Sequence, residues 1–342
     1  MRIGGLLVAA LLAAVVPIGI MHASGDNNYL VTTLVSNQPG VAPVTDGKLV
    51  NGWGITATSS SPWWVADNGT GWSTIYTGAG VKAGLEVKVP GAPTGIVAYT
   101  GGQFLLAPNR PARFMFASED GTISAWNPQF DAGNAHVVFG APGSSSVYKG
   151  LAILGNTLYT TDFGDCEVET INGSFQAFDT EGGFEDDSIP RDFCPFGIQA
   201  IGNSIFVTYA LKGGDDDVAG QGHGFVREFD VDGHLVDIVS SHGQLNSPWG
   251  LAMAPSNFGP FSGCLLVGNF GDGEINAYCK DGGNYHHQAT LRQDGQILRI
   301  DGLWGIGFGN NAASGPSNVL YFAAGPDDES NGAFGKIEFA GK

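Results

Sequence analysis

The chain has 342 residues, with 33 acidic residues against 15 basic ones and a formal net charge of −18. A phosphate backbone would be repelled by this charge, so we expect no nucleic-acid partner. Glycine is abundant, with 54 copies, and apolar residues alternate with polar ones in segments such as 224–230, which is typical of an all-β protein with many turns.

Residues 1–24 have the features of a secretory signal peptide. Arg2 supplies a positive charge, residues 6–16 form an apolar run, and small residues follow near a possible cleavage point. An uncleaved membrane anchor is the alternative, but Pro17 interrupts the run. We therefore predict a secreted, monomeric protein, extracellular or periplasmic, without membrane contact after cleavage. Residues 25–342 are predicted to form a single domain.

The segment 29–35 is a predicted strand that precedes the first repeated unit described below. The last unit is one strand short of four, because the chain ends after a strand predicted at 336–339. We expect the N-terminal strand to supply the missing outer strand of that unit. This pairing would close a ring between the two ends of the chain.

One short phrase recurs six times, ends in Gly-Ile or Gly-Leu, and opens a predicted strand. The copies are Trp53-Gly54-Ile55, Thr94-Gly95-Ile96, Lys149-Gly150-Leu151, Phe196-Gly197-Ile198, Trp249-Gly250-Leu251 and Trp304-Gly305-Ile306. They lie 41 to 55 residues apart, a spacing typical of repeat architectures.

Each phrase is followed by further predicted strands. Second strands are predicted at 63–67, 103–107, 157–162, 204–209, 264–269 and 319–323. Third strands are predicted at 122–127, 173–179, 224–230, 274–279 and 336–339, and fourth strands at 85–89, 136–139, 235–240 and 287–292. The acidic, Gly-rich stretch 180–192 is only a weak candidate for the fourth strand of the third unit. This pattern predicts a six-bladed β-propeller with four-stranded blades.

The segment 212–222 interrupts the fourth unit and contains three consecutive aspartates, so we predict a mobile surface loop. The four cysteines fit a secreted protein. Cys264 and Cys279 flank a predicted hairpin, and Cys166 and Cys194 flank loops that open on one face of adjacent blades. We predict the disulfides Cys166–Cys194 and Cys264–Cys279, and free buried thiols are the alternative.

Polar residues precede the first strands and follow the second strands, and these loops converge at one mouth of a propeller axis. They are Asn51, Asp67, Asn68, Asn109, Asp162, Asp165, Asn269, Asp272 and Asp301. Oxygen ligands of this kind suit calcium, with Asp67, Asp162 and Asp301 as candidate metal ligands. The alternative is that these residues form turns, because several of them precede glycine.

Tryptophans are also predicted at this mouth: Trp53, Trp72, Trp249 and Trp304. They could stack on a sugar, although we favour packing between neighbouring blades. The sequence contains no standard nucleophile, zinc, EF-hand or phosphate-loop motif.

Four stretches resemble a family of secreted bacterial propellers, some of which carry a PEP-CTERM sorting tail: 34–42, 49–55, 113–126 and 303–305. The resemblance implies the fold and the location but no activity. No sorting tail is visible at 338–342, which implies free secretion. More distantly, the blades resemble NHL-repeat and gluconolactonase-like propellers, a likeness of fold that does not transfer function.

Besides a purely structural role in a surface layer or matrix, two functions remain open at the axial mouth. The first is a non-catalytic binding protein for an extracellular protein, glycan or matrix component. The second is a calcium-dependent hydrolase or lyase of the lactonase kind. An enzyme requires a carboxylate deep in the mouth with a displaced pKa and no role in a turn, for which Asp301 is the sequence candidate.

Overall fold

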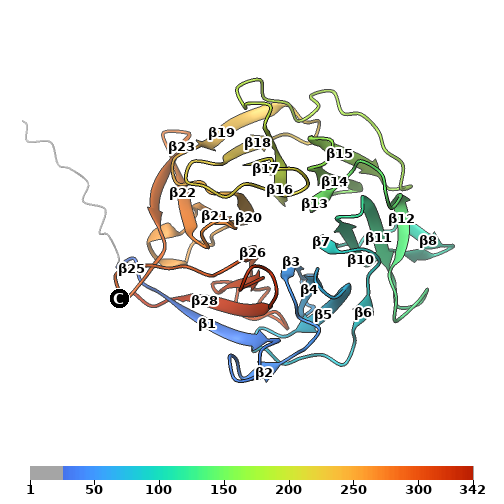
Figure 1. The fold of residues 1–342 in the computed structure, drawn as a ribbon, viewed down its shortest axis with the longest axis horizontal. Helices are drawn as coiled ribbons and strands as arrows, with labels where there is room; N and C mark the ends of the chain where they lie inside the picture. Colours follow the sequence, from blue (N-terminus) through green and yellow to red (C-terminus); the bar gives the residue numbers. More distant parts are fainter. Residues whose placement is uncertain (1–25, 342) are drawn as a thin grey trace, which may run out of the picture.

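The computed structural model describes residues 26–341 and shows six β-sheets arranged around a central axis (Figure 1). This arrangement confirms the predicted six-bladed β-propeller. The predicted leader, residues 1–24, lies outside the described residues. Within the described chain, no helix has the length and apolar character that crossing a membrane requires.

The blades follow one another along the chain, each with its first strand at the axis. Blade one contains β3 (Gly52–Thr56), β4 (Trp63–Asp67), β5 (Trp72–Tyr76) and β6 (Val87–Lys88), and blade two contains β7 (Pro93–Ala98), β10 (Phe114–Ser118), β11 (Thr122–Trp126) and β12 (His136–Gly140). Blade three contains β13 (Tyr148–Leu154), β14 (Thr157–Asp162) and β15 (Glu167–Asn172). Blade four contains β16 (Phe193–Ile201), β17 (Ser204–Leu211), β18 (Phe225–Phe229) and β19 (Leu235–Ser241), and blade five contains β20 (Pro248–Met253), β21 (Leu265–Asn269), β22 (Ile275–Asp281) and β23 (Asn284–Thr290).

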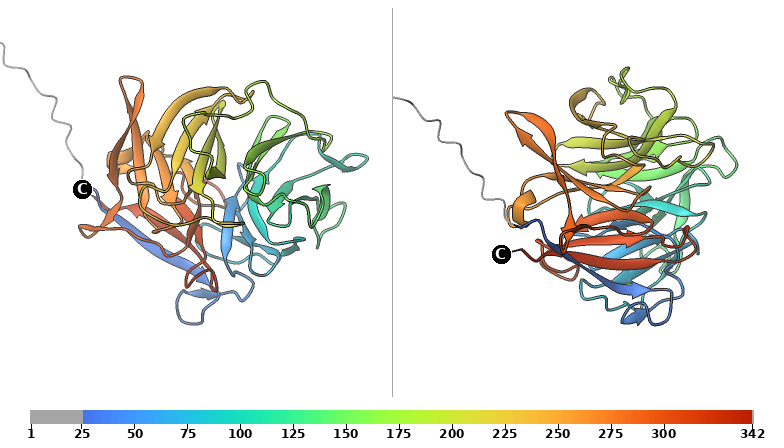
Figure 2. Two further views of the ribbon diagram at one scale, coloured as in Figure 1. Left: turned by 45° about the horizontal axis from the view of Figure 1, so that its top comes forward. Right: turned by 60° about the vertical axis from the view of Figure 1, so that its left-hand side comes forward.

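Blade six joins the two ends of the chain. Its strands are β26 (Leu303–Phe308), β27 (Leu320–Ala324), β28 (Ala333–Phe339) and β1 (Tyr29–Ser36), with the short β2 (Val44–Thr45) parallel to β1. The strands β1 and β28 run antiparallel, with Tyr29 opposite Phe339, and lie side by side in Figures 1 and 2. The predicted closure by the N-terminal strand is therefore confirmed.

Two small hairpins and one short helix lie outside the blades. The hairpins are β8 (Leu105–Ala107) with β9 (Arg110–Pro111), and β24 (Arg292–Gln293) with β25 (Gln296–Ile297). The 3₁₀ helix η1 spans Gly259–Phe261.

Several predicted strands were wrong or displaced. The second strand of blade two is β10 rather than 103–107, because the apolar run at 103–107 belongs to the β8–β9 hairpin. The third strand of blade three is β15 rather than 173–179, and that blade has no fourth strand in 180–192. The fourth strands at 85–89 and 287–292 are instead Val87–Lys88 and Asn284–Thr290.

The repeated glycines allow neighbouring blades to approach one another closely. A Cβ added to Gly54 would lie 2.6 Å from the carbonyl oxygen of Thr94, and one added to Gly250 would lie 2.6 Å from that of Trp304. The pattern continues across the closure, where a Cβ on Gly305 would lie 2.7 Å from the carbonyl oxygen of Trp53. The phrase therefore recurs because the backbone of the next blade occupies the space of a side chain.

Both predicted disulfides are confirmed. The Cα atoms of Cys166 and Cys194 lie 4.8 Å apart, and those of Cys264 and Cys279 lie 4.3 Å apart. The first disulfide links blade three to blade four, and the second lies within blade five. The described chain has no free cysteine.

Candidate functional site at the axial mouth

The six residues that precede the repeated glycines surround one end of the propeller axis, which we call the axial mouth. They are Trp53, Thr94, Lys149, Phe196, Trp249 and Trp304, and all are buried. Four of them are aromatic, and Lys149 alone is charged. The repeat therefore places a single cation in a ring of otherwise uncharged side chains.

The aromatic side chains of Trp53, Trp249 and Trp304 pack against one another and against Phe270 beneath the mouth, and we call this layer the aromatic floor. The rings of Trp53 and Trp304 stack with centroids 3.7 Å apart, and Phe270 stacks on Trp304 at 3.9 Å. Trp249 meets Trp304 edge-on at 5.8 Å. Trp72 lies apart from this floor, beneath the Lys48 ammonium, which is 3.4 Å from the ring centroid.

Below the floor, the axis narrows to an aliphatic channel. The isoleucines and leucines of the repeated phrase, including Ile55, Ile96 and Leu151, line a cavity of only about 20 Å³. A cavity of this size is smaller than a sugar or any larger ligand. The polar groups near the axis lie instead on the other side of the indoles, at the mouth.

Lys149 is the centre of a polar network above the floor. Its ammonium nitrogen lies 2.6 Å from Glu119 Oε1 and 2.8 Å from Asp216 Oδ1, and 5.3 Å from the centroid of the Trp53 ring. The side chain of Lys149 is 1% exposed, whereas those of Glu119 and Asp216 are 27% and 79% exposed. The cation is therefore buried, and the carboxylates that neutralise it face solvent.

Amide side chains extend this network toward blades one and six. Asn68 donates a hydrogen bond from Nδ2 to Glu119 Oε2, and Asn51 donates from Nδ2 to Asn68 Oδ1 and to Glu329 Oε1. Asn51 Oδ1 accepts from the Trp304 indole nitrogen. Asn51 thus connects the aromatic floor to two carboxylates.

The segment 212–222 reaches across the ring to the mouth. It carries Asp216 to Lys149, and the Gly220 amide donates to Asn246 Oδ1 at the entry to blade five. Residues 213–216 are exposed, as predicted for a surface loop, and these contacts place part of the loop at the axial mouth.

In the described chain, four buried polar atoms at or beside the mouth have no hydrogen-bond partner: Trp53 Nε1, Asp217 Oδ2, Ser247 Oγ and Asn269 Oδ1. The Ser247 hydroxyl lies near the Asp217 carboxyl, but the two do not meet in hydrogen-bonding geometry. The indole nitrogen of Trp249 donates to the carbonyl of Lys149, and that of Trp304 donates to Asn51 Oδ1. The indole nitrogen of Trp53, at the equivalent position of blade one, has no acceptor in the described chain. Unpaired buried donors and acceptors are uncommon and require an explanation.

Three ionisable groups at the mouth, Lys149, Asp217 and Glu329, have displaced pKa values. Burial tends to lower the pKa of Lys149, but the carboxylates of Glu119 and Asp216 outweigh burial and raise it. Burial raises the pKa of Asp217. Burial also raises the pKa of Glu329, although the hydrogen bond from Asn51 opposes this shift. The mouth therefore holds one lysine with a raised pKa and two carboxyl groups that retain a proton to higher pH than usual.

The candidate metal ligands predicted from the sequence do not form one group. Asp67 is fully buried within blade one, where Oδ1 accepts from Thr74 Oγ1 and Oδ2 has no partner. Asp162 Oδ1 accepts from two backbone amides, and Asp301 Oδ2 accepts from the Asp327 amide. Residues 26–341 contain no group of three His, Cys, Asp or Glu side chains placed to hold a metal ion.

The other predicted site residues separate into two sets. Asn51, Trp53, Trp249 and Trp304 belong to the mouth, as described above. Asn269 is buried beside it and donates to the Gln244 carbonyl and to Asp272. Asn109 lies in the β8–β9 hairpin between the first two strands of blade two, at the end of the blade opposite the mouth.

The sequence analysis missed Glu119, Lys149, Asp216, Asp217, Ser247 and Glu329. One signal was present, because Lys149 is the only charged residue directly before a glycine of the repeated phrase. Glu119 was missed because the second strand of blade two was misplaced, which put Asn109 where Glu119 belongs. Glu329 lies in the turn-like stretch 325–331, which gave no signal of a site.

Comparison with known proteins places the chain in a family. It is 32% identical over 326 residues to the uncharacterized protein R648 of Acanthamoeba polyphaga mimivirus, covering 90% of this chain and 80% of that protein. It is also 32% identical to the uncharacterized protein L690 of the same virus, covering 90% and 85% of the two chains. The chain belongs to the family of these proteins. These viral relatives do not support the bacterial and PEP-CTERM part of the sequence resemblance, and no family model matches the chain.

Solved structures support the propeller fold at low sequence identity. The soluble aldose sugar dehydrogenase of Escherichia coli superposes with a TM-score of 0.58 at 14% identity, covering 91% of this chain and 99% of that one. An inactive virginiamycin B lyase from Staphylococcus aureus with quinupristin superposes with a TM-score of 0.52 at 14% identity, covering 91% and 100%. Likeness at this level of identity establishes the fold alone.

Proposed function

We propose that this protein is a secreted binding protein whose axial mouth receives a polyhydroxylated ligand, that is, a glycan. The observation that carries the proposal is the convergence of all six blades on one polar site. Asn51 comes from blade one, Glu119 from blade two, Lys149 from blade three, Asp216 and Asp217 from blade four, Ser247 from blade five, and Glu329 from blade six.

The chemistry of the mouth matches hydroxyl groups, which both donate and accept hydrogen bonds. Lys149 and Trp53 Nε1 donate, Glu119 and Asp216 accept, and the amides do both. A ligand hydroxyl could satisfy the buried atoms Trp53 Nε1, Asp217 Oδ2 and Ser247 Oγ. A flat, uncharged apolar ligand would leave these groups unpaired, which favours a polar one.

The proposed location rests on the disulfides and the leader. Two disulfides in one chain are typical of an oxidising compartment. The segment 1–24 has the sequence pattern of a secretory signal. N-terminal sequencing of the protein exported from its native host tests this part of the proposal, and an intact leader would overturn it.

A second candidate function, a hydrolase or lyase acting at the same mouth, is favoured by two carboxyl groups. Glu329 and Asp217 both have raised pKa values because they are buried. Glu329 accepts a hydrogen bond from Asn51, and a carboxyl group with a raised pKa is suited to act as a general acid. Propellers of similar fold include a lyase and a sugar dehydrogenase.

A glycan array separates the two candidates. The purified full-length mature protein is applied at 150 mM salt, and glycans that bind are then incubated with it and analysed for cleavage by mass spectrometry. We expect binding without turnover. Cleavage that Glu329→Gln abolishes and the exposed Glu185→Gln leaves intact would establish the enzyme instead. Failure to bind any glycan on the array would overturn the binding proposal.

A further inference from the structure

Within residues 26–341, blade three lacks the fourth strand that every other blade has. Its sheet ends at β15, because the chain after Asn172 leaves the blade and runs without a strand to Phe193 at the start of β16. This segment touches the outer edge of β15 only near its end, where Ile171 bridges Ala177 and the Phe178 amide donates to the carbonyl of Thr170. From Glu167 to Glu169 the edge has no strand partner in residues 26–341.

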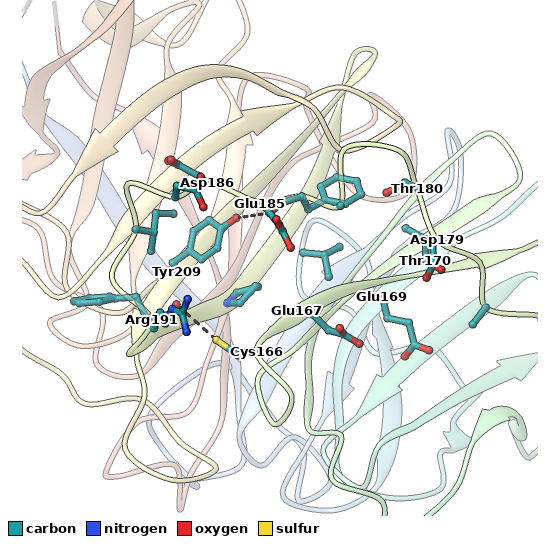
Figure 3. Close-up of a pocket in the computed structure, with 18 of the residues that line it drawn as sticks. Cys166, Glu167, Glu169, Thr170, Asp179, Thr180, Glu185, Asp186, Arg191 and Tyr209 are labelled. Carbon is teal, nitrogen blue, oxygen red and sulfur yellow. Dashed lines mark hydrogen bonds between the residues drawn. The ribbon is translucent and has the colours of Figure 1, made fainter.

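A cavity of about 870 Å³ lies beside this open edge, between blades three and four (Figure 3). Part of its lining is apolar, including Val168, Ile189 and Phe193, and Phe178 is 39% exposed. The Cys166–Cys194 disulfide ties the two blades together at one end of the cavity. The space has the position of the missing fourth strand and the volume of several residues.

The polar lining of the cavity is strongly acidic. Glu167, Glu169, Asp179, Glu185 and Asp187 line it, and none of them forms an ion pair with a described residue. Burial raises the pKa of both Glu167 and Glu169, and nearby carboxylates add to the shift. Among the lining residues, Asp186 is neutralised by Arg227, whereas Arg191 is exposed and forms no ion pair with a described residue.

We propose that blade three is completed by an extended, basic polypeptide segment of a partner protein, which pairs with the edge of β15 as a fourth strand. The outward-facing amide and carbonyl of Val168 supply strand hydrogen bonds, whereas those of Glu167 and Glu169 face β14. The apolar wall takes alternate side chains of the segment, and Lys or Arg side chains between them neutralise the carboxylates. This site is separate from the axial mouth and adds a protein partner to the proposed function.

The test uses a fluorescein-labelled ten-residue peptide of alternating valine and lysine, with binding followed by fluorescence anisotropy at 150 mM salt. The variant Glu167→Gln/Glu185→Gln removes two exposed lining carboxylates. Asp281→Asn/Asp294→Asn removes two exposed carboxylates elsewhere and is the charge-matched control. We expect the lining variant to bind at least tenfold more weakly and the control to bind within twofold of wild type. Equal weakening by both variants, or no binding by wild type, would overturn the proposal.

A second probe distinguishes strand addition from attraction by charge alone. The same peptide with N-methyl groups on alternate residues keeps its charges but cannot donate hydrogen bonds along one edge. We expect its affinity to fall at least tenfold, and we expect the unmethylated peptide to slow exchange of the outward-facing Val168 amide. Equal affinity for the two peptides would contradict the assignment of a fourth strand.

Discussion

The ammonium nitrogen of Lys149 lies 2.8 Å from Asp216 Oδ1, although the lysine side chain is buried and the aspartate side chain is largely exposed. Lys149 begins the inner strand of blade three, and Asp216 is carried by the loop that blade four extends over the axis. The pair therefore attaches a loop to the centre of the ring. It also leaves the anionic side of the site open to solvent and to a ligand.

Because the Lys149 ammonium is buried and its carboxylate partners are partly exposed, removing the ammonium and removing the carboxylates should lower the free energy of unfolding by different amounts. Lys149→Met should destabilise the protein by about 1–2 kcal/mol, because Glu119 and Asp216 are partly exposed and regain water. Glu119→Gln/Asp216→Asn should cost about 3–5 kcal/mol, because it leaves the ammonium buried and unpaired. Urea unfolding of the three proteins provides the comparison. A larger loss for the methionine variant would refute this description of the pair.

Closure of the ring predicts that Tyr29 stabilises the whole propeller. Its ring is fully buried against Phe258 and Phe261, and its hydroxyl donates to the carbonyl of Phe258. Tyr29→Ala should cost about 3–5 kcal/mol and lower the single unfolding transition of all blades. The neighbouring Leu30, which is 47% exposed, is the matched control, and Leu30→Ala should change stability by less than about 0.5 kcal/mol. Separate melting of blade six alone in calorimetry would disagree with closure by strand pairing.

Because the repeated glycines lie against the backbone of the next blade, replacing one of them with alanine should lower stability more than the same replacement at an open glycine. Gly250→Ala should destabilise by about 2 kcal/mol or more, because the new Cβ would lie 2.6 Å from the carbonyl oxygen of Trp304. Gly84 has ordinary φ and open space around it, so Gly84→Ala should be neutral or stabilising by up to about 1 kcal/mol. Chemical denaturation of both variants tests the prediction. Equal stability of the Gly250→Ala and Gly84→Ala variants would mean that packing between blades does not require glycine.

The buried carboxyl of Asp67 predicts a pH-dependent stability difference. Burial raises its pKa well above the ordinary value in the folded chain, whereas in the unfolded chain it titrates near pH 4. The stability that this group contributes is full below about pH 4 and is lost as pH rises through the folded pKa. Asp67→Asn cannot lose a proton, so its advantage over wild type should grow between pH 4 and pH 8.

Thermal unfolding at several pH values measures that advantage. Asp281→Asn, which removes an exposed carboxylate, controls for the change in net charge. A difference between wild type and Asp67→Asn that stays constant with pH would show that the carboxyl is ionised in the folded protein.

The fold could be predicted because each unit contains the same local signal. The Gly-Ile or Gly-Leu pair marks every inner strand, and the unpaired strand at 29–35 marks the closure. Strands were misplaced where local patterns compete. Strand β10, the second strand of blade two, contains the apolar run Phe114–Ala117, and the stretch 103–107 contains a similar apolar run that ends in a turn, so apolar character alone does not separate the two.

The candidate site could be predicted only in part, because it is assembled by the ring rather than by a local motif. Glu119, Lys149 and Glu329 are far apart in the chain and meet only after all six blades have closed. Asp216 and Glu329 lie in stretches that look like ordinary polar turns. The calcium hypothesis arose from the same ambiguity, since Asp162 and Asp301 accept hydrogen bonds from turn amides.

Binding of a glycan at the axial mouth is tested most directly by one affinity ratio. The dissociation constant of a glycan identified on the array is measured by titration calorimetry for wild type, Asp216→Asn and Asp215→Asn. Both variants lose one carboxylate from the same loop, but only Asp216 contacts Lys149. We expect at least tenfold weaker binding for Asp216→Asn and a change within twofold for Asp215→Asn. Equal affinity of the two variants would place the glycan elsewhere and contradict the axial mouth as the binding site.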